Sequence, residues 1–142
     1  MANIEVKMTV NNTDAVLSQL QDAVKTALEA VGVQAQGHAT DNITANDSVD
    51  TGVLRSSITF EVEDDTVAIG TNVHYAPYIE FGTGIHAESG GGRQTPWAWQ
   101  DMQGNWHRTS GMEPKPFLRP AIEDNLDEYQ QIMAQVLSQI GK

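Results

Sequence analysis

The tripeptide Asp50-Thr51-Gly52 has the residue types and the order of an aspartic protease active site. In a retropepsin-like homodimer, two such aspartates share a proton and activate water for peptide hydrolysis. That loop belongs to an almost all-β fold, whereas polar residues precede it here and long helical patterns flank the region. We therefore interpret Asp50 and Thr51 as suppliers of turn hydrogen bonds, with Gly52 letting the next strand begin. A protease that uses Asp50 is the alternative interpretation.

Other residues that could do chemistry lack the required spacing. The run Gly90-Gly91-Gly92 is not followed by the Lys-Ser/Thr pair of a phosphate-binding loop. The chain has no Cys, which excludes disulfides and thiolate metal ligands. No H-E-x-x-H or comparable metal-binding pattern is formed by the histidines, which are His38, His74, His86 and His107. We expect no catalytic set, no metal and no cofactor.

The chain is strongly acidic, with a formal net charge of −11 from 8 basic and 19 acidic residues. Such a surface repels phosphate backbones, so we expect no sequence-specific nucleic-acid binding. No segment approaches the roughly 20 apolar residues of a membrane span. The first six residues also lack the basic and apolar segments of a signal peptide. We expect a soluble protein that folds where it is made, as one domain over residues 1–142.

The first 50 residues predict a strand, a long helix and a loop. Residues 3–10 alternate between apolar and polar side chains, as a half-buried strand does. From Val16 to Ala35, apolar residues recur every three to four positions, which is typical of an amphipathic helix. We expect this helix to end near residue 40, weakened by Gly32 and Gly37. The polar stretch 42–50 predicts a loop.

The middle of the chain predicts a β-hairpin followed by a short helix. Apolar or small residues alternate with polar ones from Leu54 to Glu63, and Asp64-Asp65 supplies a turn. Residues 66–70 return as the partner strand. Residues 75–81 then have the spacing of a helical turn.

Residues 85–113 form an inserted segment that contains all three tryptophans of the chain. A turn over residues 100–105 predicts a Trp-bearing hairpin there. From Leu118 to Ile140 apolar residues recur at helical spacing, with Pro120 in the first turn, where its missing amide proton costs little. The predicted class is α+β: a small antiparallel sheet, with a long N-terminal amphipathic helix and a C-terminal helix packed on it, plus the inserted hairpin.

Six aromatic residues are candidates for contacts between subunits. The three in residues 75–81 share one helical face, and core packing is favoured over an interface for them. The tryptophans lie outside the regular core and are awkward for one copy to bury, so a contact surface and local packing are equally supported. The candidates are Tyr75, Tyr78, Phe81, Trp97, Trp99 and Trp106.

Three motifs occur in an order that is similar to a known family. The first is Asp50-Thr51-Gly52-Val53-Leu54-Arg55-Ser56-Ser57-Ile58. The second is Tyr75-Ala76-Pro77-Tyr78-Ile79-Glu80-Phe81-Gly82-Thr83, and the third is Pro114-Lys115-Pro116-Phe117-Leu118-Arg119-Pro120-Ala121. Together they resemble the neck and tail-completion (head–tail joining) proteins of tailed double-stranded DNA phages, including minor tail components of the gpZ type. The resemblance covers most of the chain.

The resemblance implies a structural virion protein rather than an enzyme. Such a protein would assemble in the host cytoplasm as a homo-oligomeric ring or collar that joins the capsid connector to the long tail. Its partners would be other neck and tail proteins, among them the connector or stopper and the tail terminator, with DNA passing close by and no membrane involved.

The acidic surface generates a first prediction about DNA. Seven of the 19 carboxylates lie between Asp41 and Asp65, and we expect this region to be exposed. Purified protein should give no shifted duplex in a gel-shift assay at ~20 mM salt, where electrostatic screening is weakest. A shifted duplex at micromolar protein would contradict the prediction.

Overall fold

The computed structural model describes residues 13–46 and 51–140. The strand predicted for residues 3–10 and the aspartate Asp50 lie outside this part of the chain. The described elements are α1 (Thr13–Asn46), α2 (Thr51–Ser57), β1 (Thr59–Glu63), β2 (Thr66–Gly70), α3 (Ala76–Phe81), the 3-10 turn η1 (Gly84–His86), β3 (Trp97–Gln100), β4 (Trp106–Thr109), α4 (Leu118–Glu123) and α5 (Leu126–Leu137). The mixed α+β class predicted from the sequence is confirmed.

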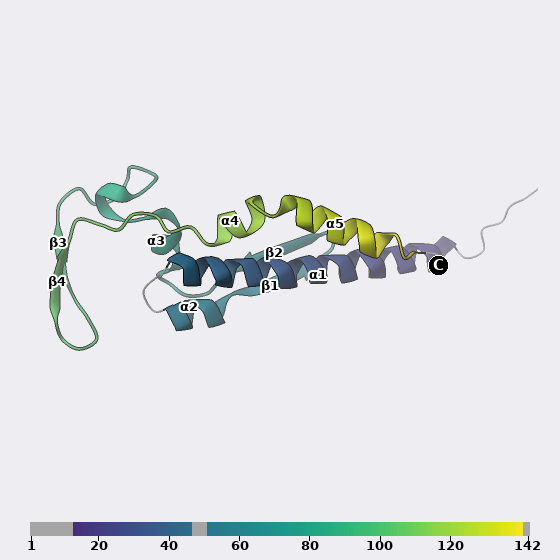
Figure 1. Cartoon of the computed structure of the whole chain (residues 1–142), viewed down its shortest axis with the longest axis horizontal. Coiled ribbons are helices and arrows are strands. Elements are labelled where there is room, and N and C mark those ends of the chain that lie inside the picture. The colour runs from purple at the N-terminus through teal and green to yellow at the C-terminus, as the bar shows by residue number, and fades with distance from the viewer. Residues whose placement is uncertain (1–12, 47–50, 141–142) are drawn as a thin grey trace, which may run out of the picture.

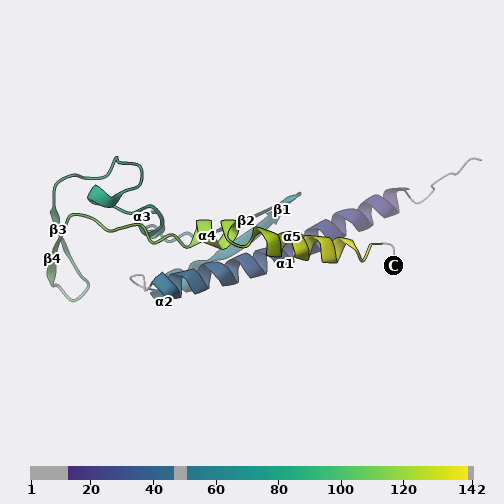
Figure 2. The same cartoon turned by 45° about the horizontal axis from the view of Figure 1, so that its top comes forward.

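The molecule is elongated, and α1 forms its spine (Figure 1). This helix has 34 residues and is about 50 Å long at 1.5 Å per residue. The β1–β2 hairpin and α5 lie alongside it, and α5 runs in the opposite direction. The β3–β4 hairpin stands away from these elements at one end of the molecule in both views (Figures 1 and 2).

The helix α1 continues to Asn46, so the loop predicted from residue 42 was wrong over residues 42–46. Two asparagine side chains in this stretch explain why polar residues are helical here. Asn42 Nδ2 donates to the Phe117 carbonyl at 3.2 Å, and Asn46 Nδ2 donates to the Pro116 carbonyl at 3.0 Å. The last turns of α1 are thus stabilised by a segment some 70 residues further along the chain.

The strand predicted from Leu54 was also wrong at its start, because residues 51–57 form α2. Leu54 and Ile58 lie four positions apart and are both buried in the main core, while Arg55 and Ser56 are exposed. Gly52 lies inside this helix and does not begin a strand. The main core is completed by residues of α1, α3 and the third motif, and its buried members are Ala39, Ile43, Leu54, Ile58, Ala76, Ile79, Phe117 and Ala121.

The strands β1 and β2 form the predicted hairpin, with Phe60 opposite Ile69 and Val62 opposite Val67. Asp64 occupies the turn with φ 53°, a conformation that aspartate tolerates better than most residues. The less exposed side chains of the hairpin alternate with exposed ones, and α1 packs along it. The carboxylates Asp41, Glu61, Glu63, Asp64 and Asp65 are exposed, as expected.

The C-terminal segment is two helices, α4 and α5, and not the single helix that the periodicity predicts. The helices separate at Asp124 and Asn125, where Asn125 Nδ2 donates to the Ala121 carbonyl at 3.1 Å. The buried Tyr129 hydroxyl donates to the same carbonyl. Tyr129 packs with Val31 and Ala35 of α1 in a second, smaller core. No helix in the described residues is long and apolar enough to cross a membrane.

Two glycines of α1 give a prediction about packing. A methyl group at Gly32 would overlap the Phe60 ring of β1, whereas one at Gly37 would meet nothing within 4 Å. Gly32→Ala should therefore destabilise the protein by about 1–3 kcal/mol through overpacking, despite the higher helix propensity of Ala. Gly37→Ala is the matched control and should stabilise it by about 0.5–1 kcal/mol. Urea unfolding of both variants measures the difference, and equal effects would contradict the close packing.

Candidate functional site

The buried carboxylate of Glu80 joins the second and third motifs. Glu80 lies in α3 with 3% of its surface exposed. It accepts hydrogen bonds from the backbone N–H groups of Phe117 (2.7 Å), Leu118 (3.0 Å) and Arg119 (3.0 Å). These amides stand at the start of α4, where backbone donors have no partner within the helix. A carboxylate from α3 therefore caps α4.

Arg119 surrounds the same carboxylate and extends the network outward. Its Nε donates to Glu80 Oε1 at 3.0 Å, and its Nη2 donates to the Glu80 carbonyl at 2.8 Å. The guanidinium also donates to both carboxylate oxygens of Glu88, at 2.8 and 3.0 Å. Its Cζ lies 4.6 Å from the centre of the Phe81 ring. One arginine thus fixes α3, the loop after η1 and α4 relative to one another.

These contacts determine the charge of the network. Burial alone would raise the pKa of Glu80, but the backbone hydrogen bonds of residues 117–119 and the Arg119 side chain outweigh it and lower that pKa. The hydrogen bonds with Glu88 and then Glu80 raise the pKa of Arg119 still further above neutral pH. The network is therefore ionised at neutral pH, and its role is to hold structure.

The Trp-bearing segment leaves the body of the protein through two backbone arms that lie side by side. The Thr83 amide donates to the Met112 carbonyl at 2.9 Å, and the Ile85 amide donates to the Ser110 carbonyl at 3.0 Å. Gly84 (φ 61°) and Gly111 (φ 130°) permit this approach, because a Cβ on either would overlap the backbone of the other arm. The two ends of the segment are thereby held together at its base.

The hairpin β3–β4 presents its aromatic residues on two different faces. Trp97 and Trp99 alternate with Ala98 on β3, and Trp99 pairs with His107 of β4. Successive side chains point to opposite faces of a strand, so Trp106 lies on the other face from His107. The exposed fraction is 45% for Trp99 and 69% for Trp106, and Met102 in the turn is 99% exposed.

A polar contact stiffens the tip of this hairpin. His107 stacks on Trp99 with ring centres 4.5 Å apart, and its Nε2 lies 2.8 Å from Asp101 Oδ2. The other Asp101 oxygen accepts from the amides of Gln103 (3.0 Å) and Asn105 (2.8 Å) across the turn. The His107 contact and these amides lower the pKa of Asp101. The hairpin is therefore held in shape although it stands apart from the core.

Tyr78 and Trp97 both line a groove of about 490 Å³. Most of its other lining residues belong to the glycine-rich segment 82–92. Arg93 also lines the groove, and its Cζ lies 5.6 Å from the centre of the Trp97 ring. Tyr78 is 57% exposed. The structure thus brings one candidate of the second motif next to one of the Trp hairpin.

The remaining predicted residues fall into two groups. Tyr75 is half-buried and packs against the main core, whereas Phe81 is 46% exposed beneath Arg119. Core packing, the interpretation favoured for the helical turn, therefore applies to Tyr75 alone. In the third motif Phe117 is fully buried, while the side chains of Pro116, Leu118, Arg119 and Pro120 are partly exposed. Gly82 is buried and has φ 80°.

Two features of the site were missed by sequence reasoning. Glu80 was part of a motif without an assigned role, because its partners lie 37 to 39 residues away. The pairing of His107 with Trp99 follows from the hairpin register, once the turn is placed at residues 101–105. In the part of the chain that the structure describes, no three His, Asp or Glu residues gather in a way that could hold a metal ion.

Comparison with known families identifies the class of this protein. A model of a family of phage tail components matches residues 9–82, just over half of the chain, including the first motif and most of the second. The protein is thus a structural component of a bacteriophage tail. It belongs to the family described as "Bacteriophage HK97-gp10, putative tail-component", which confirms the resemblance inferred from the motifs. Comparison with curated proteins and with solved structures gives no match.

The Glu80 network gives a prediction about stability and pH. Glu80→Gln leaves at least one of the three amides without a good acceptor, so the free energy of unfolding near pH 7 should fall by about 1–3 kcal/mol. Glu88→Gln is the control, since Glu88 is exposed and touches only Arg119 within the network; it should change stability little.

The pH dependence follows from the lowered pKa of Glu80. Its contribution is present above the ordinary pKa of 4.5 and is lost as pH falls through the lower value in the folded protein. The stability difference between the native protein and Glu80→Gln should therefore shrink on acidification. Urea unfolding at a series of pH values measures this, and a difference that stays constant below the ordinary pKa would contradict it.

Proposed function

We propose that this tail component works at the head–tail junction, as a neck or tail-completion protein. It assembles there into an oligomeric ring or collar that joins the capsid connector or stopper to the tail terminator. Residues 1–142 act as one domain, in which residues 85–113 are an insertion. The proposal is supported by the family match and by the order of the three motifs.

The observation that carries the proposal is the exposed aromatic surface on a projecting hairpin. Trp99 and Trp106 on the two strands and Met102 in the turn between them expose large apolar side chains, and this hairpin lies at one end of the molecule (Figure 1). Tryptophan and methionine are enriched where proteins meet, and a monomer gains nothing by exposing them. The contact between Asp101 and His107 keeps the hairpin in one conformation before a partner binds. Less conformational entropy is therefore lost on binding.

The body of the protein is suited to carry such a surface. The hydrogen bonds of the Thr83 and Ile85 amides join the two ends of the insertion at its base. The Glu80 carboxylate then joins α3 to the chain after the insertion, at the Phe117 amide. A contact made by the hairpin can therefore be lost or changed without unfolding the helices. We therefore propose that the hairpin determines which partner is bound and that the helices form the rigid body that carries the hairpin.

The test separates assembly from folding. The double change Trp99→Ala with Trp106→Ala should leave the thermal unfolding midpoint nearly unchanged, because neither side chain packs in either hydrophobic core. The variant should fail to restore tailed particles to a phage that lacks the protein, leaving heads and tails unjoined. Electron microscopy of lysates and the mass of the purified protein measure these outcomes.

Val53→Ala serves as the control, since Val53 is also apolar and 59% exposed but lies on α2. It should assemble normally. Unfolding of the tryptophan variant would mean that these residues are core. A folded variant that joins heads to tails as the native protein does would overturn the role of the hairpin.

A further inference from the structure

The N-terminal half of α1 has an apolar stripe that the other residues described by the structure leave largely uncovered. Val16, Leu17 and Leu20 are 45%, 51% and 41% exposed. They continue the helical face on which Ala27, Leu28 and Val31 are buried further along α1. The stripe leads into a groove between α1 and the tip of the β1–β2 hairpin.

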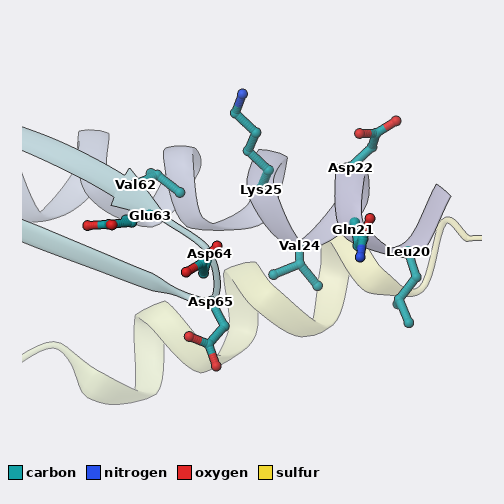
Figure 3. A pocket seen from close by; sticks show the side chains of 9 residues that line it. All are labelled: Leu20, Gln21, Asp22, Val24, Lys25, Val62, Glu63, Asp64 and Asp65. Carbon is teal, nitrogen blue, oxygen red and sulfur yellow. The ribbon is translucent and has the colours of Figure 1, made fainter. Parts of the chain in front are cut away.

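This groove has a volume of about 770 Å³ and combines apolar and acidic residues. Leu20, Val24 and Val62 are its apolar lining residues; Val24 lies between Leu20 and the hairpin turn, and Val62 lies on the hairpin beyond it (Figure 3). Its charged lining consists of four carboxylates and one ammonium group, from Asp22, Glu63, Asp64, Asp65 and Lys25. The groove therefore favours an occupant with an apolar side chain and a cation.

One face of the Trp hairpin has this combination. Trp106 and Arg108 are two positions apart on β4, so they share the face opposite to Trp99 and His107. Both side chains are exposed, Trp106 by 69%. The other residues of this face are Ala98 and Gln100, which carry no charge. We call Trp106, Arg108, Ala98 and Gln100 the basic hairpin face.

We propose that the basic hairpin face of one copy docks in the acidic groove of a second copy. Trp106 then covers Leu20 and Val24, and Arg108 pairs with the carboxylates of the hairpin turn. The hairpin lies at one end of the elongated molecule and the groove lies toward the other (Figures 1 and 3). One copy therefore cannot satisfy both of its own patches.

The contact is heterologous, because each copy offers a hairpin to one neighbour and a groove to another. Repeated contacts of this kind close into a ring when the rotation between copies permits. This inference rests on the proposed function in one respect: it supplies the contact that builds the proposed oligomer. It assigns that contact to a second copy of this chain rather than to a different tail protein or to residues 1–12.

Two variants, each lacking one half of the contact, test the proposal. The hairpin variant carries Trp106→Ala and Arg108→Glu. The groove variant carries Glu63→Lys and Asp65→Lys, and it leaves Asp64 unchanged because of its positive φ. The native protein should oligomerise, and each variant alone should be a monomer. An equimolar mixture should form a heterodimer and no larger species. The intact hairpin of the groove variant can dock in the intact groove of the hairpin variant, and no second contact of this kind is then possible.

Sedimentation velocity measures these masses, and circular dichroism checks that both variants are folded. A mixture in which both variants stay monomeric would overturn the proposal and indicate another occupant of the groove. A variant that oligomerises like the native protein would also overturn it, as would a native protein that stays monomeric at about 1 mM.

A cross-link gives a second, independent measurement. The chain has no Cys, so one introduced cysteine on each of two copies can form only intermolecular disulfides. Mixing Gln100→Cys protein with Asp65→Cys protein under mild oxidation should give a covalent heterodimer. Gln34→Cys, on an exposed part of α1, replaces Asp65→Cys in the control and should not cross-link. Equal yields in both mixtures would overturn the proposal.

The test of this contact between copies can fail independently of the test of the proposed junction function. Labelling in intact particles shows whether the protein lies at the head–tail junction, whatever contacts it makes there. A protein found at the junction whose variants give no heterodimer would overturn this contact and leave the junction function standing.

Discussion

The carboxylate of Glu80 is the constraint on which the rest of the structure depends. It accepts hydrogen bonds from three backbone amides at the start of α4, and those amides belong to a segment separated from it by the whole Trp insertion. A buried carboxylate is costly unless hydrogen bonds and a counter-charge compensate it, and Arg119 completes that compensation. Because the Phe117 side chain then enters the main core and its carbonyl accepts from Asn42, the end of α1 is fixed by the same junction.

This arrangement separates a rigid body from a projecting hairpin. The body is closed at Glu80, and the insertion is closed again where Gly84 and Gly111 let the two backbone arms meet. Beyond this second contact, the segment 85–109 contributes no buried residue to either core. Its sequence can therefore change with little effect on the helices, which is a physical basis for assigning partner choice to it.

The elements that depend on local pattern could be predicted from the sequence. The long amphipathic helix, both hairpins and the short helix of the second motif follow from periodicity and turn residues, and all appear in the structure. The error at residues 54–57 has a specific cause: Leu54 and Ile58 fit an alternating strand as well as a helical spacing of four. The structure decides for the helix: Leu54 and Ile58 are both buried, whereas Ser56 between them is exposed.

The other errors arise from contacts that are distant in sequence. Asn42 and Asn46 have the composition of a loop, and they are helical because their amides reach the backbone at Phe117 and Pro116. The break before α5 likewise depends on the Ala121 carbonyl, which accepts from both Asn125 and Tyr129. The role of Glu80 is of the same kind. Such pairings require the fold before they can be recognised, whereas the aromatic candidates needed only composition and position.

Charge distribution determines what an acidic tail component can do with its own copies. At a net charge of −11, two copies repel each other in most orientations. Arg93 and Arg108 lie on or beside the Trp hairpin, while the exposed carboxylates of β1 and its turn lie along α1. Repulsion is therefore weakest when a hairpin approaches an acidic groove. Electrostatics of this kind selects orientation more than affinity, and the exposed tryptophans and the apolar stripe of α1 supply the area to be buried.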